Sequence, residues 1–389
     1  MKSNFYTINR LSDLDHFLPV AQLKFSNEKL NIYFIFIGLD ASLKNLKNDP
    51  RLKIINKLKF KSKNLKLLNL FYKLDKLILK TLPKFIYSKM SYYLQKLFYL
   101  IIKIKFYFFL ISFRPKKIFV DISFSYKFLK YLKRILNFNI ISLPHGLHLH
   151  EGYIDENLDS VVFPVFKPSK IIDKIVLCNN NDKKILKIDG VKEINCLGSL
   201  RYSYYWINYL KDNFNLKPTN DNSKIQVIFF EDKNGQNHNG KFIPWVNLNL
   251  LNEVADYLSK IKNIEIIVCK HPSKKTKDFL KYNFRYSELE EMSFNLVYNA
   301  DIVIGTIGTS ILDAYLLNKK IISLSYCHYF KSIINKFEKD TVVDNFNDFK
   351  SMFNKVISEV NYNKNLNYIN FYDHIIGNKK LSEKKYIDL

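Results

Sequence analysis

The chain contains little cysteine and lacks the apolar leader of an exported protein. Its four cysteines, Cys178, Cys196, Cys269 and Cys327, are widely spaced among 389 residues and form neither a CxxC pair nor a dense disulfide framework. Residues 1–17 lack the uninterrupted apolar core of a signal peptide. These absences argue against a disulfide-built secreted domain and predict a cytoplasmic protein.

A long apolar stretch without charges is also missing. The most apolar segment, residues 97–113, is interrupted by Lys103 and Lys105 and is short for a membrane span. Two interpretations stay open for it. The segment is either a helix packed inside the N-terminal domain or, with the basic and aromatic residues 82–96, a peripheral contact with the anionic inner face of the plasma membrane.

Acidic residues are few: 36 Asp and Glu stand against 61 Lys and Arg, which leaves a formal charge of +25. Such a balance favours anionic partners in general. The chain has no RNP motif, zinc-finger spacing or basic heptad region, so a nucleic-acid partner is not predicted. A non-catalytic basic protein that binds polyanions remains an alternative.

Short apolar runs alternate with longer, lysine-rich segments that suit helices. This alternation predicts an α/β protein with parallel sheets and crossover helices, and the continuous apolar character predicts strands covered on both faces. The predicted strands are residues 31–39, 116–123, 139–143, 174–178, 225–230, 264–269, 301–305 and 319–325.

A polar segment containing Pro218 separates two groups of predicted strands. We therefore expect an N-terminal domain at 1–205, a linker at 206–223, a second domain at 224–345 and a helical tail at 346–389. The charged end of this tail is expected to be exposed or frayed.

The first candidate ligand loop follows the strand at 301–305. Its glycines allow close backbone approach, and its free amides and hydroxyls, at the start of a helix, suit an anion such as a phosphate. The residues are Gly305, Thr306, Gly308, Thr309 and Ser310. Ser310 and Asp313 have the spacing of a capping box, so Asp313 is interpreted as a helix cap.

Two further loops follow predicted strands, where parallel α/β sheets bind their ligands. Lys270 and His271 end the strand at 264–269, where they could neutralise a phosphate, and the imidazole could protonate a leaving group. Gly235 lies in the loop after the strand at 225–230, where it could approach a diphosphate.

Residues 142–153, SLPHGLHLHEGY, hold three of the eight histidines of the chain. His145 follows the strand at 139–143 and is the predicted base or acceptor contact, with Glu151 as its first substitute. His148 and His150 are interpreted as structural or exposed. A metal site is not predicted, because zinc hydrolase signatures such as H-E-x-x-H are absent.

Taken in order, four short stretches resemble GT-B glycosyltransferases of bacterial capsule and surface polysaccharide synthesis, and are related in pattern to CDP-glycerol glycerophosphotransferases. These stretches are His145-Gly146, residues 198–201, residues 270–272 and residues 301–313. The resemblance implies two Rossmann-like parallel-sheet domains facing a central cleft, with the acceptor on the N-terminal domain and the nucleotide donor on the second.

The resemblance further implies that His271 contacts or protonates the donor phosphate, that residues 305–310 cradle it, and that His145 acts on the acceptor. The expected reaction transfers a sugar from a nucleotide-sugar to a glycan or glycolipid acceptor such as capsule or lipopolysaccharide. It is expected to invert configuration and to use neither a metal ion nor a cofactor beyond the co-substrate. Leu200, where related sequences often have proline, and the form of residues 304–314 favour sugar transfer over the alternative, CDP-polyol-dependent transfer of glycerol or ribitol phosphate.

Overall fold

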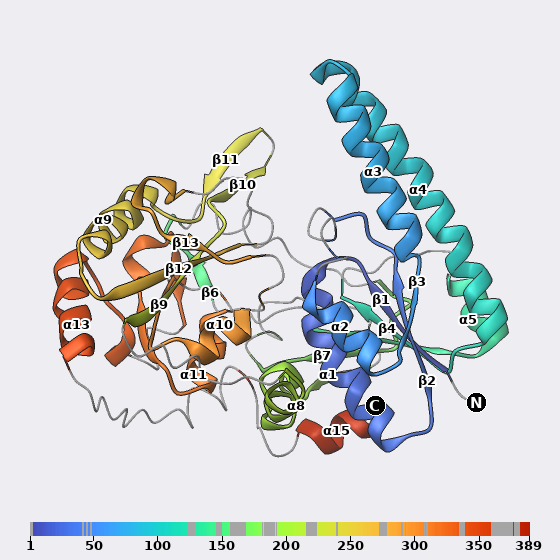
Figure 1. Ribbon diagram of the computed structural model, residues 1–389. Helices are drawn as coiled ribbons and strands as arrows, with labels where there is room; N and C mark the ends of the chain where they lie inside the picture. The colour runs from blue at the N-terminus through green and yellow to red at the C-terminus, as the bar shows by residue number, and fades with distance from the viewer. Residues whose placement is uncertain are drawn as a thin grey trace. The chain divides into compact units, whose positions relative to one another are not determined.

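A computed structural model shows the chain as two compact units, each described by itself (Figure 1). Unit 1 comprises Met1–Gly146, Phe166–Arg201 and Gly377–Leu389, and unit 2 comprises Leu147–Val165 and Tyr202–Ile376. The structure describes residues 3–40, 43, 46, 49–122, 129–144, 150–155, 169–180, 182, 191, 193–214, 224–238, 240–271, 278–288, 291, 293–306, 308, 310–333, 339–358, 376 and 382–389.

Unit 1 is built on a seven-stranded sheet whose paired strands are all parallel. From one edge to the other the strands are β3 (Lys61–Lys63), β2 (Asn31–Phe36), β1 (Ser3–Ile8), β4 (Lys117–Asp121), β5 (Asn139–Leu143), β7 (Lys174–Leu177) and β8 (Glu193–Cys196). The chain moves outward from β1 in one direction to β3 and then returns to β4. The order therefore reverses between β1 and β4.

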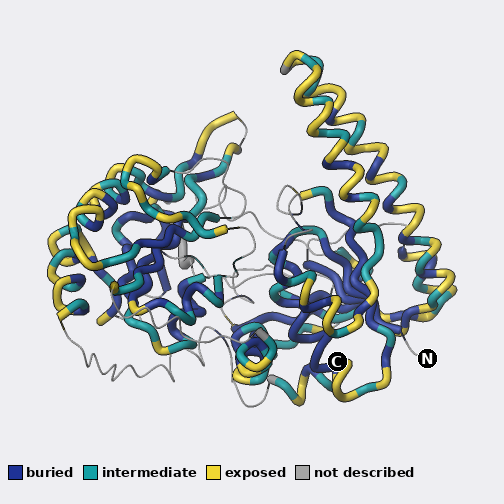
Figure 2. Tube along the Cα trace, in the orientation of Figure 1, coloured by how far each residue is buried: buried dark blue, intermediate teal, exposed yellow. Residues whose placement is uncertain are grey.

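The central strands of this sheet are buried, whereas the edge strands β3 and β8 are partly exposed (Figure 2). All six residues of β1 are buried, and the ring of Tyr6 stacks on Phe34 at 5.3 Å and on Phe119 at 4.6 Å between centroids. Aromatic stacking across β2, β1 and β4 thus fixes the centre of the sheet, because such rings bury large areas with a defined geometry.

Helices connect the strands of unit 1. They are α1 (Leu11–Asn27), α2 (Pro50–Lys57), α3 (Leu65–Thr81), α4 (Lys84–Phe113) and α5 (Leu129–Leu136). Helices α3 and α4 form an antiparallel hairpin that projects from the sheet (Figure 1). At its base Phe113 contacts Tyr33 of β2, with ring centroids 4.8 Å apart. No helix in the described part of the chain is long and apolar enough to span a membrane.

Unit 2 has a five-stranded parallel sheet with the order β13 (Arg285–Tyr286), β12 (Ile264–Lys270), β9 (Ile225–Glu231), β14 (Ile302–Gly305) and β15 (Lys320–Ser323). Here too the order reverses next to the first strand, between β9 and β14. The eight predicted strands all form, and the predicted α/β class is confirmed. The sequence prediction missed β1, β3, β8 and β13 among the sheet strands.

Smaller elements complete unit 2. Its helices are α8 (Tyr204–Phe214), α9 (Leu248–Ser259), α10 (Ser293–Asn299), α11 (Ile311–Leu316) and α13 (Phe346–Ser358). Strands β10 (Gly235–His238) and β11 (Lys241–Pro244) form a hairpin, and β6 (His150–Tyr153) pairs antiparallel with β16 (Phe330–Ser332). The core gathers Phe229, Val254, Val268 and Phe349, all without exposed surface.

The unit boundaries differ from the predicted domain boundaries at both ends of unit 2. Residues 204–214, expected in a linker, form helix α8, while α13, expected in a tail, buries Phe349, Phe353 and Val356. The last helix, α15 (Ser382–Asp388), belongs to unit 1, where the Lys24 ammonium donates to the Ile387 carbonyl at 3.0 Å and the Tyr386 hydroxyl to the Gly198 carbonyl at 2.8 Å. The expectation of an exposed or frayed end is wrong for residues 382–389, because Tyr386 and Leu389 supply apolar surface that unit 1 buries.

Candidate functional site

In unit 1, charged groups gather where the strand order reverses. Arg10 and Asp13 follow β1, and Asp121 ends the neighbouring strand β4. The guanidinium of Arg10 contacts both carboxylates: Nη2 lies 3.0 Å from Asp121 Oδ2, and Nε lies 3.9 Å from Asp13 Oδ1. Both carboxylates are fully buried, whereas the Arg10 side chain is 38% exposed. Open parallel sheets bind their ligands at this point, outside the carboxyl ends of the strands.

Asp13 has an ionisation behaviour unusual for an aspartate. Burial, followed by the charge of Asp121, raises the pKa of Asp13 to about 7, against the opposing effects of Arg10 and of backbone N–H groups. Its Oδ2 accepts hydrogen bonds from the N–H groups of Asn9 at 2.7 Å and Arg10 at 3.0 Å. A pKa raised toward neutrality is one property of a general base, and the fully buried carboxylate would have to become accessible before it could take a proton from a substrate.

This cluster was not predicted from the sequence. Asp13 is also the third residue of α1, where it caps the helix by accepting from the Arg10 N–H. Helix capping explains one carboxylate at this position but not a second buried carboxylate from β4. A signal was present in the sequence: an Arg-x-x-Asp after one strand and an Asp at the end of another. Recognising it required knowing that the SNFYTI stretch is a central strand.

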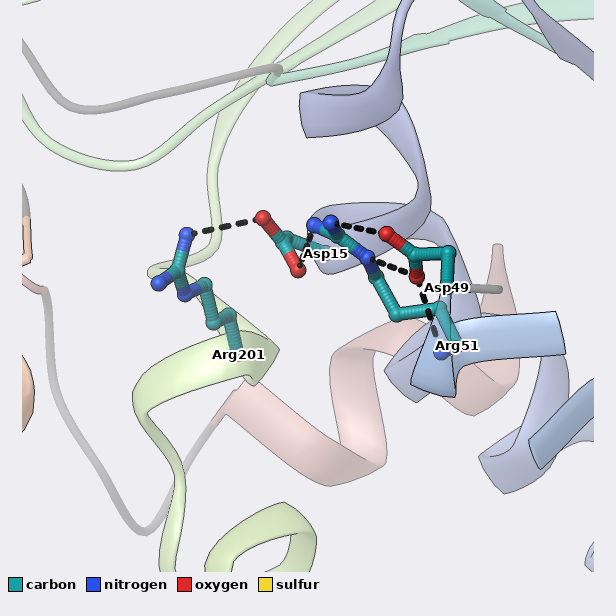
Figure 3. Close-up of polar contacts among 4 residues, drawn as sticks. All are labelled: Asp15, Asp49, Arg51 and Arg201. Atoms are coloured by element: carbon teal, nitrogen blue, oxygen red, sulfur yellow. Dashed lines mark hydrogen bonds and ion pairs between the residues drawn. The ribbon is translucent and has the colours of Figure 1, made fainter. Parts of the chain in front are cut away.

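A second ionic network lies on α1 and α2 (Figure 3). Arg51 bonds Asp49 through Nη2 at 2.7 Å and Asp15 through Nη1 at 2.9 Å, and Arg201 reaches the other oxygen of Asp15 at 3.4 Å. Burial alone would raise the pKa of Asp15, but Arg51 and then Arg201 hold it below its usual value. Arg201, which lies in one of the four stretches that carry the resemblance, thus has a structural contact in unit 1.

In unit 2, the corresponding reversal point lies between β9 and β14, and the predicted glycine loop follows β14 there. Gly305 ends β14, and Gly308 lies against Asp232, which follows β9: a Cβ added at Gly308 would sit 2.8 Å from Asp232 Oδ1. Thr306 is buried, and its hydroxyl has no hydrogen-bond partner among the described residues. The loop thus brings a glycine, a hydroxyl and a carboxylate to one edge of the sheet.

The helix that begins after this loop is shorter than the anion-pocket interpretation requires. Helix α11 has six residues, so its dipole contributes little. The predicted capping box through Ser310 does not form: Ser310 has helical angles (φ −64°, ψ −26°) in place of the extended ones of a capping residue, and its side chain makes no capping hydrogen bond. The Ser310 hydroxyl is therefore not used as a helix cap.

The end of β12 carries Lys270 and His271 next to β9. The His271 N–H donates to the Glu231 carbonyl at 3.0 Å, which extends the β12–β9 pairing by one residue. Glu231 is buried, and its Oε1 accepts from the Asp278 N–H at 3.0 Å. Lys270 and His271 are both partly exposed, and the Lys270 ammonium forms no ion pair with any residue that the structure describes. Lys270 therefore places a partly exposed positive charge at this edge of the sheet.

Gly235 has a packing role. A Cβ there would lie 2.2 Å from the Ile243 carbonyl oxygen and 3.0 Å from Pro244 Cα, because β11 runs directly beside it. This packing accounts for the glycine by itself, and contact with a diphosphate stays a prediction.

The two glycines are expected to differ in how they tolerate a methyl group. Gly235→Ala forces backbone atoms of β11 apart and is expected to cost about 2 kcal/mol more of unfolding free energy than Gly308→Ala. At Gly308 the obstructing atom is the end of the Asp232 side chain, which can rotate away. Urea unfolding of the two variants measures the difference, and equal costs would contradict the close approach of β11.

Two of the predicted site residues are not described. His145 and Thr309 lie outside the described residues. Glu151 lies in β6, which pairs with β16 and belongs to unit 2, although the sequence analysis placed it in the N-terminal domain. This pairing joins segments about 180 residues apart, which local sequence does not reveal. Among the described residues, no three His, Cys, Asp or Glu side chains are grouped as metal ligands.

The fold is similar to those of solved structures. No protein-family model matches the chain, and no curated protein matches it in sequence. UDP-N-acetylglucosamine 2-epimerase from Rickettsia bellii matches with a TM-score of 0.53 and 13% identity, covering 100% of this chain and 95% of that one. MnaA from S. aureus, solved with UDP, matches with a TM-score of 0.51 and 12% identity, covering 92% and 88%. The wall teichoic acid polymerase TagF gives a TM-score of 0.49 and 12% identity, covering 99% and 87%. The first two matches confirm the predicted GT-B fold.

Proposed function

We propose that the protein is a glycosyltransferase that moves a sugar from a nucleotide-sugar to a glycan or glycolipid acceptor. The observation that carries the proposal is the buried pair Asp13 and Asp121 with Arg10, at the reversal point of a sheet in a GT-B chain. A carboxyl group whose pKa is raised toward neutrality at such a point would be suited to remove a proton from an acceptor hydroxyl, provided that substrate binding exposes it. The acceptor would be a growing capsule or lipopolysaccharide chain in the cytoplasm.

On the donor side, we assign the nucleotide to the edge of the unit 2 sheet. Lys270 and His271 supply the positive charge and proton that a departing nucleotide phosphate needs, and the hydroxyls of Thr306 and Ser310 can donate hydrogen bonds to its oxygens. The Asp232 carboxylate beside Gly308 would repel a phosphate at that position. It suits a ribose hydroxyl, which donates hydrogen bonds to carboxylates in nucleotide-binding folds.

On the acceptor side, the ionised form of Asp13 would accept the proton as the acceptor oxygen attacks the anomeric carbon. The bond from that carbon to the nucleotide phosphate breaks in the same step, with inversion at the carbon. Arg10 and Asp121 keep Asp13 in place and set its pKa. His145, with Glu151 as its substitute, remains the alternative base from the sequence analysis. No step of this scheme calls for a metal ion, because Lys270 and His271 offset the phosphate charge.

Titration calorimetry with UDP, CDP, GDP and CMP at physiological salt tests the donor assignment. We expect saturable binding of one nucleotide, weakened about tenfold in Lys270→Met and in His271→Ala, since each removes one charge-assisted contact. Lys241→Met, which removes an exposed lysine of β11, is the matched control and should bind like wild type.

The other outcomes separate the alternatives. Equal binding of all four nucleotides, sensitive to salt and indifferent to Lys270 and His271, would replace the enzyme with a polyanion-binding protein. Consumption of CDP-polyol in place of a nucleotide-sugar would establish the glycerol or ribitol phosphate transferase. Conversion of a nucleotide-sugar without any acceptor would contradict transfer altogether.

A further inference from the structure

Helix α4 carries apolar side chains on two opposite faces. One face is buried against the rest of unit 1 and includes Phe98, Ile102, Phe106 and Leu110. The other face is exposed and repeats at helical spacing. It consists of Tyr93, Leu97, Leu100, Ile104, Phe108 and Ile111, each between 46% and 68% exposed, and we call it the exposed stripe.

The exposed stripe is too continuous to be an ordinary surface feature. The spacings of four, three, four, four and three residues place all six side chains on one side of the helix, over about 27 Å of its length. Phe85, at the free end of the hairpin, is 71% exposed, and Leu70 and Leu77 add exposed apolar surface on α3. Soluble chains rarely leave an apolar area of this extent without a partner.

The charge of the hairpin restricts what that partner can be. Helices α3 and α4 contain nine lysines and a single acidic residue, Asp75. Asp75 is directed into the hairpin, where it accepts hydrogen bonds from the hydroxyls of Ser91 at 2.7 Å and Tyr87 at 3.2 Å. Lys89, Lys96 and Lys103 are exposed and seven residues apart, so they form a row along one flank of the exposed stripe.

We propose that the α3–α4 hairpin docks on the surface of an anionic lipid bilayer, with the exposed stripe at the level of the acyl chains and the lysine row at the head groups. An apolar stripe flanked by lysines is the arrangement of helices that lie in a membrane interface. Lysine stems reach from the edge of the apolar face to the phosphates. The proposal goes beyond the proposed function and does not depend on it.

Two other occupants fit the hairpin less well. A second copy of the chain would bring two strongly basic hairpins together, and like charges oppose such a contact. A different protein is the second such occupant, but protein interfaces are depleted in lysine, whereas lysines flank the exposed stripe.

The hairpin is firmly attached to unit 1. Phe113 packs on Tyr33, and Phe98 packs on Phe71 of α3 at 5.2 Å between ring centroids. A rigid attachment would hold unit 1 at a defined distance from the lipid surface.

Vesicle co-sedimentation of the full chain tests the proposal. The vesicles contain phosphatidylcholine alone or with about 30% phosphatidylglycerol. Wild type is expected to bind the anionic vesicles at least about tenfold more tightly than the neutral ones, and added salt should weaken the binding. The triple variant Leu97→Gln, Leu100→Gln, Phe108→Gln is expected to lose about 100-fold in vesicle affinity, because it removes three of the six apolar side chains of the exposed stripe.

The matched control substitutes three exposed large apolar residues outside the hairpin: Tyr131→Gln, Ile135→Gln and Leu280→Gln. This control is expected to bind vesicles like wild type. In a second measurement, brominated lipid should quench the tryptophan fluorescence of the Ile104→Trp variant. Equal vesicle binding by wild type and both triple variants would overturn the proposal. A dimer in solution that only the hairpin variant dissociates, with no vesicle binding by wild type, would assign the stripe to a second copy.

Discussion

Asp13→Asn is expected to lower the rate of sugar transfer by at least about 100-fold while the protein keeps its fold. The amide retains the shape of the side chain and an oxygen for the N–H groups of Asn9 and Arg10, but it cannot accept the proton of an acceptor hydroxyl. The rate of wild type should rise with pH through about 7, where Asp13 loses its proton, and this rise should vanish in the variant. Initial rates across this pH range, with the nucleotide-sugar that calorimetry identifies, provide the measurement.

The same substitution has a signature in stability that needs no substrate. The folded-state pKa of Asp13, about 7, lies above its unfolded value, so the folded chain binds more protons between the two values. The free energy of unfolding therefore falls as pH rises through this window, because a buried carboxyl must ionise. An asparagine side chain cannot ionise, so Asp13→Asn should raise stability relative to wild type by about 2 to 3 kcal/mol more at pH 8 than at pH 5.

Asp256→Asn is the control for both measurements, because Asp256 is more than half exposed and its ion pair among the described residues is with its helical neighbour Lys260. It should leave the rate and its pH dependence unchanged. A wild-type rate in Asp13→Asn would remove Asp13 as the base and return that role to His145. A stability difference independent of pH would show that Asp13 serves only as a helix cap.

Arg51→Met is expected to lower the free energy of unfolding by about 3 kcal/mol. Arg51 is the shared partner of Asp15 and Asp49 and is mostly buried, with 16% of its side chain exposed (Figure 3). Methionine fills a similar volume but leaves Asp49 without its cation and Asp15 with Arg201 alone, at 3.4 Å. An intact buried ion pair contributes little net stability. Removing one partner, however, leaves an unpaired buried carboxylate, which lowers the free energy of unfolding.

The loss should depend on pH in a defined direction. In wild type the pKa of Asp15 lies below its usual value, so its contribution is present above the unfolded pKa and disappears as pH falls through the folded value. The deficit of Arg51→Met should accordingly be largest near neutral pH and shrink in acid. Lys260→Met, which breaks an ion pair with both side chains more than half exposed, should cost less than about 0.5 kcal/mol. Urea unfolding of both variants decides: similar costs would contradict the network as a stabilising element.

Sequence alone determined the class of the fold and the strand ends at which the candidate site residues lie. Runs such as IQVIFF and IEIIVC are apolar throughout most of their length, and burial on both faces is a property that each strand carries in its own residues. The loops after them could therefore be located, and the residues Lys270, His271, Gly305 and Gly308 do lie at the carboxyl edge of the unit 2 sheet.

The position of β1 could not be predicted in this way. Its sequence, SNFYTI, mixes polar and apolar residues, yet all six are buried because β2 and β4 pair with it on both sides. The exposed stripe of α4 could not be predicted either, although its residues are apolar. An apolar residue in a helix does not reveal which face the rest of the fold covers.

Tertiary structure alone decided which distant residues come together in the candidate site. Asp121 lies more than 100 residues from Arg10, and only the reversal of strand order brings it beside Asp13. Likewise, pairing with β16 assigns Glu151 to unit 2, and α15 returns to unit 1 from the far end of the chain. Local sequence determines which segments must be buried, because burial depends on the apolar surface of each segment. Their order in the sheet, and with it the pKa of Asp13, depends on contacts between segments that no single stretch contains.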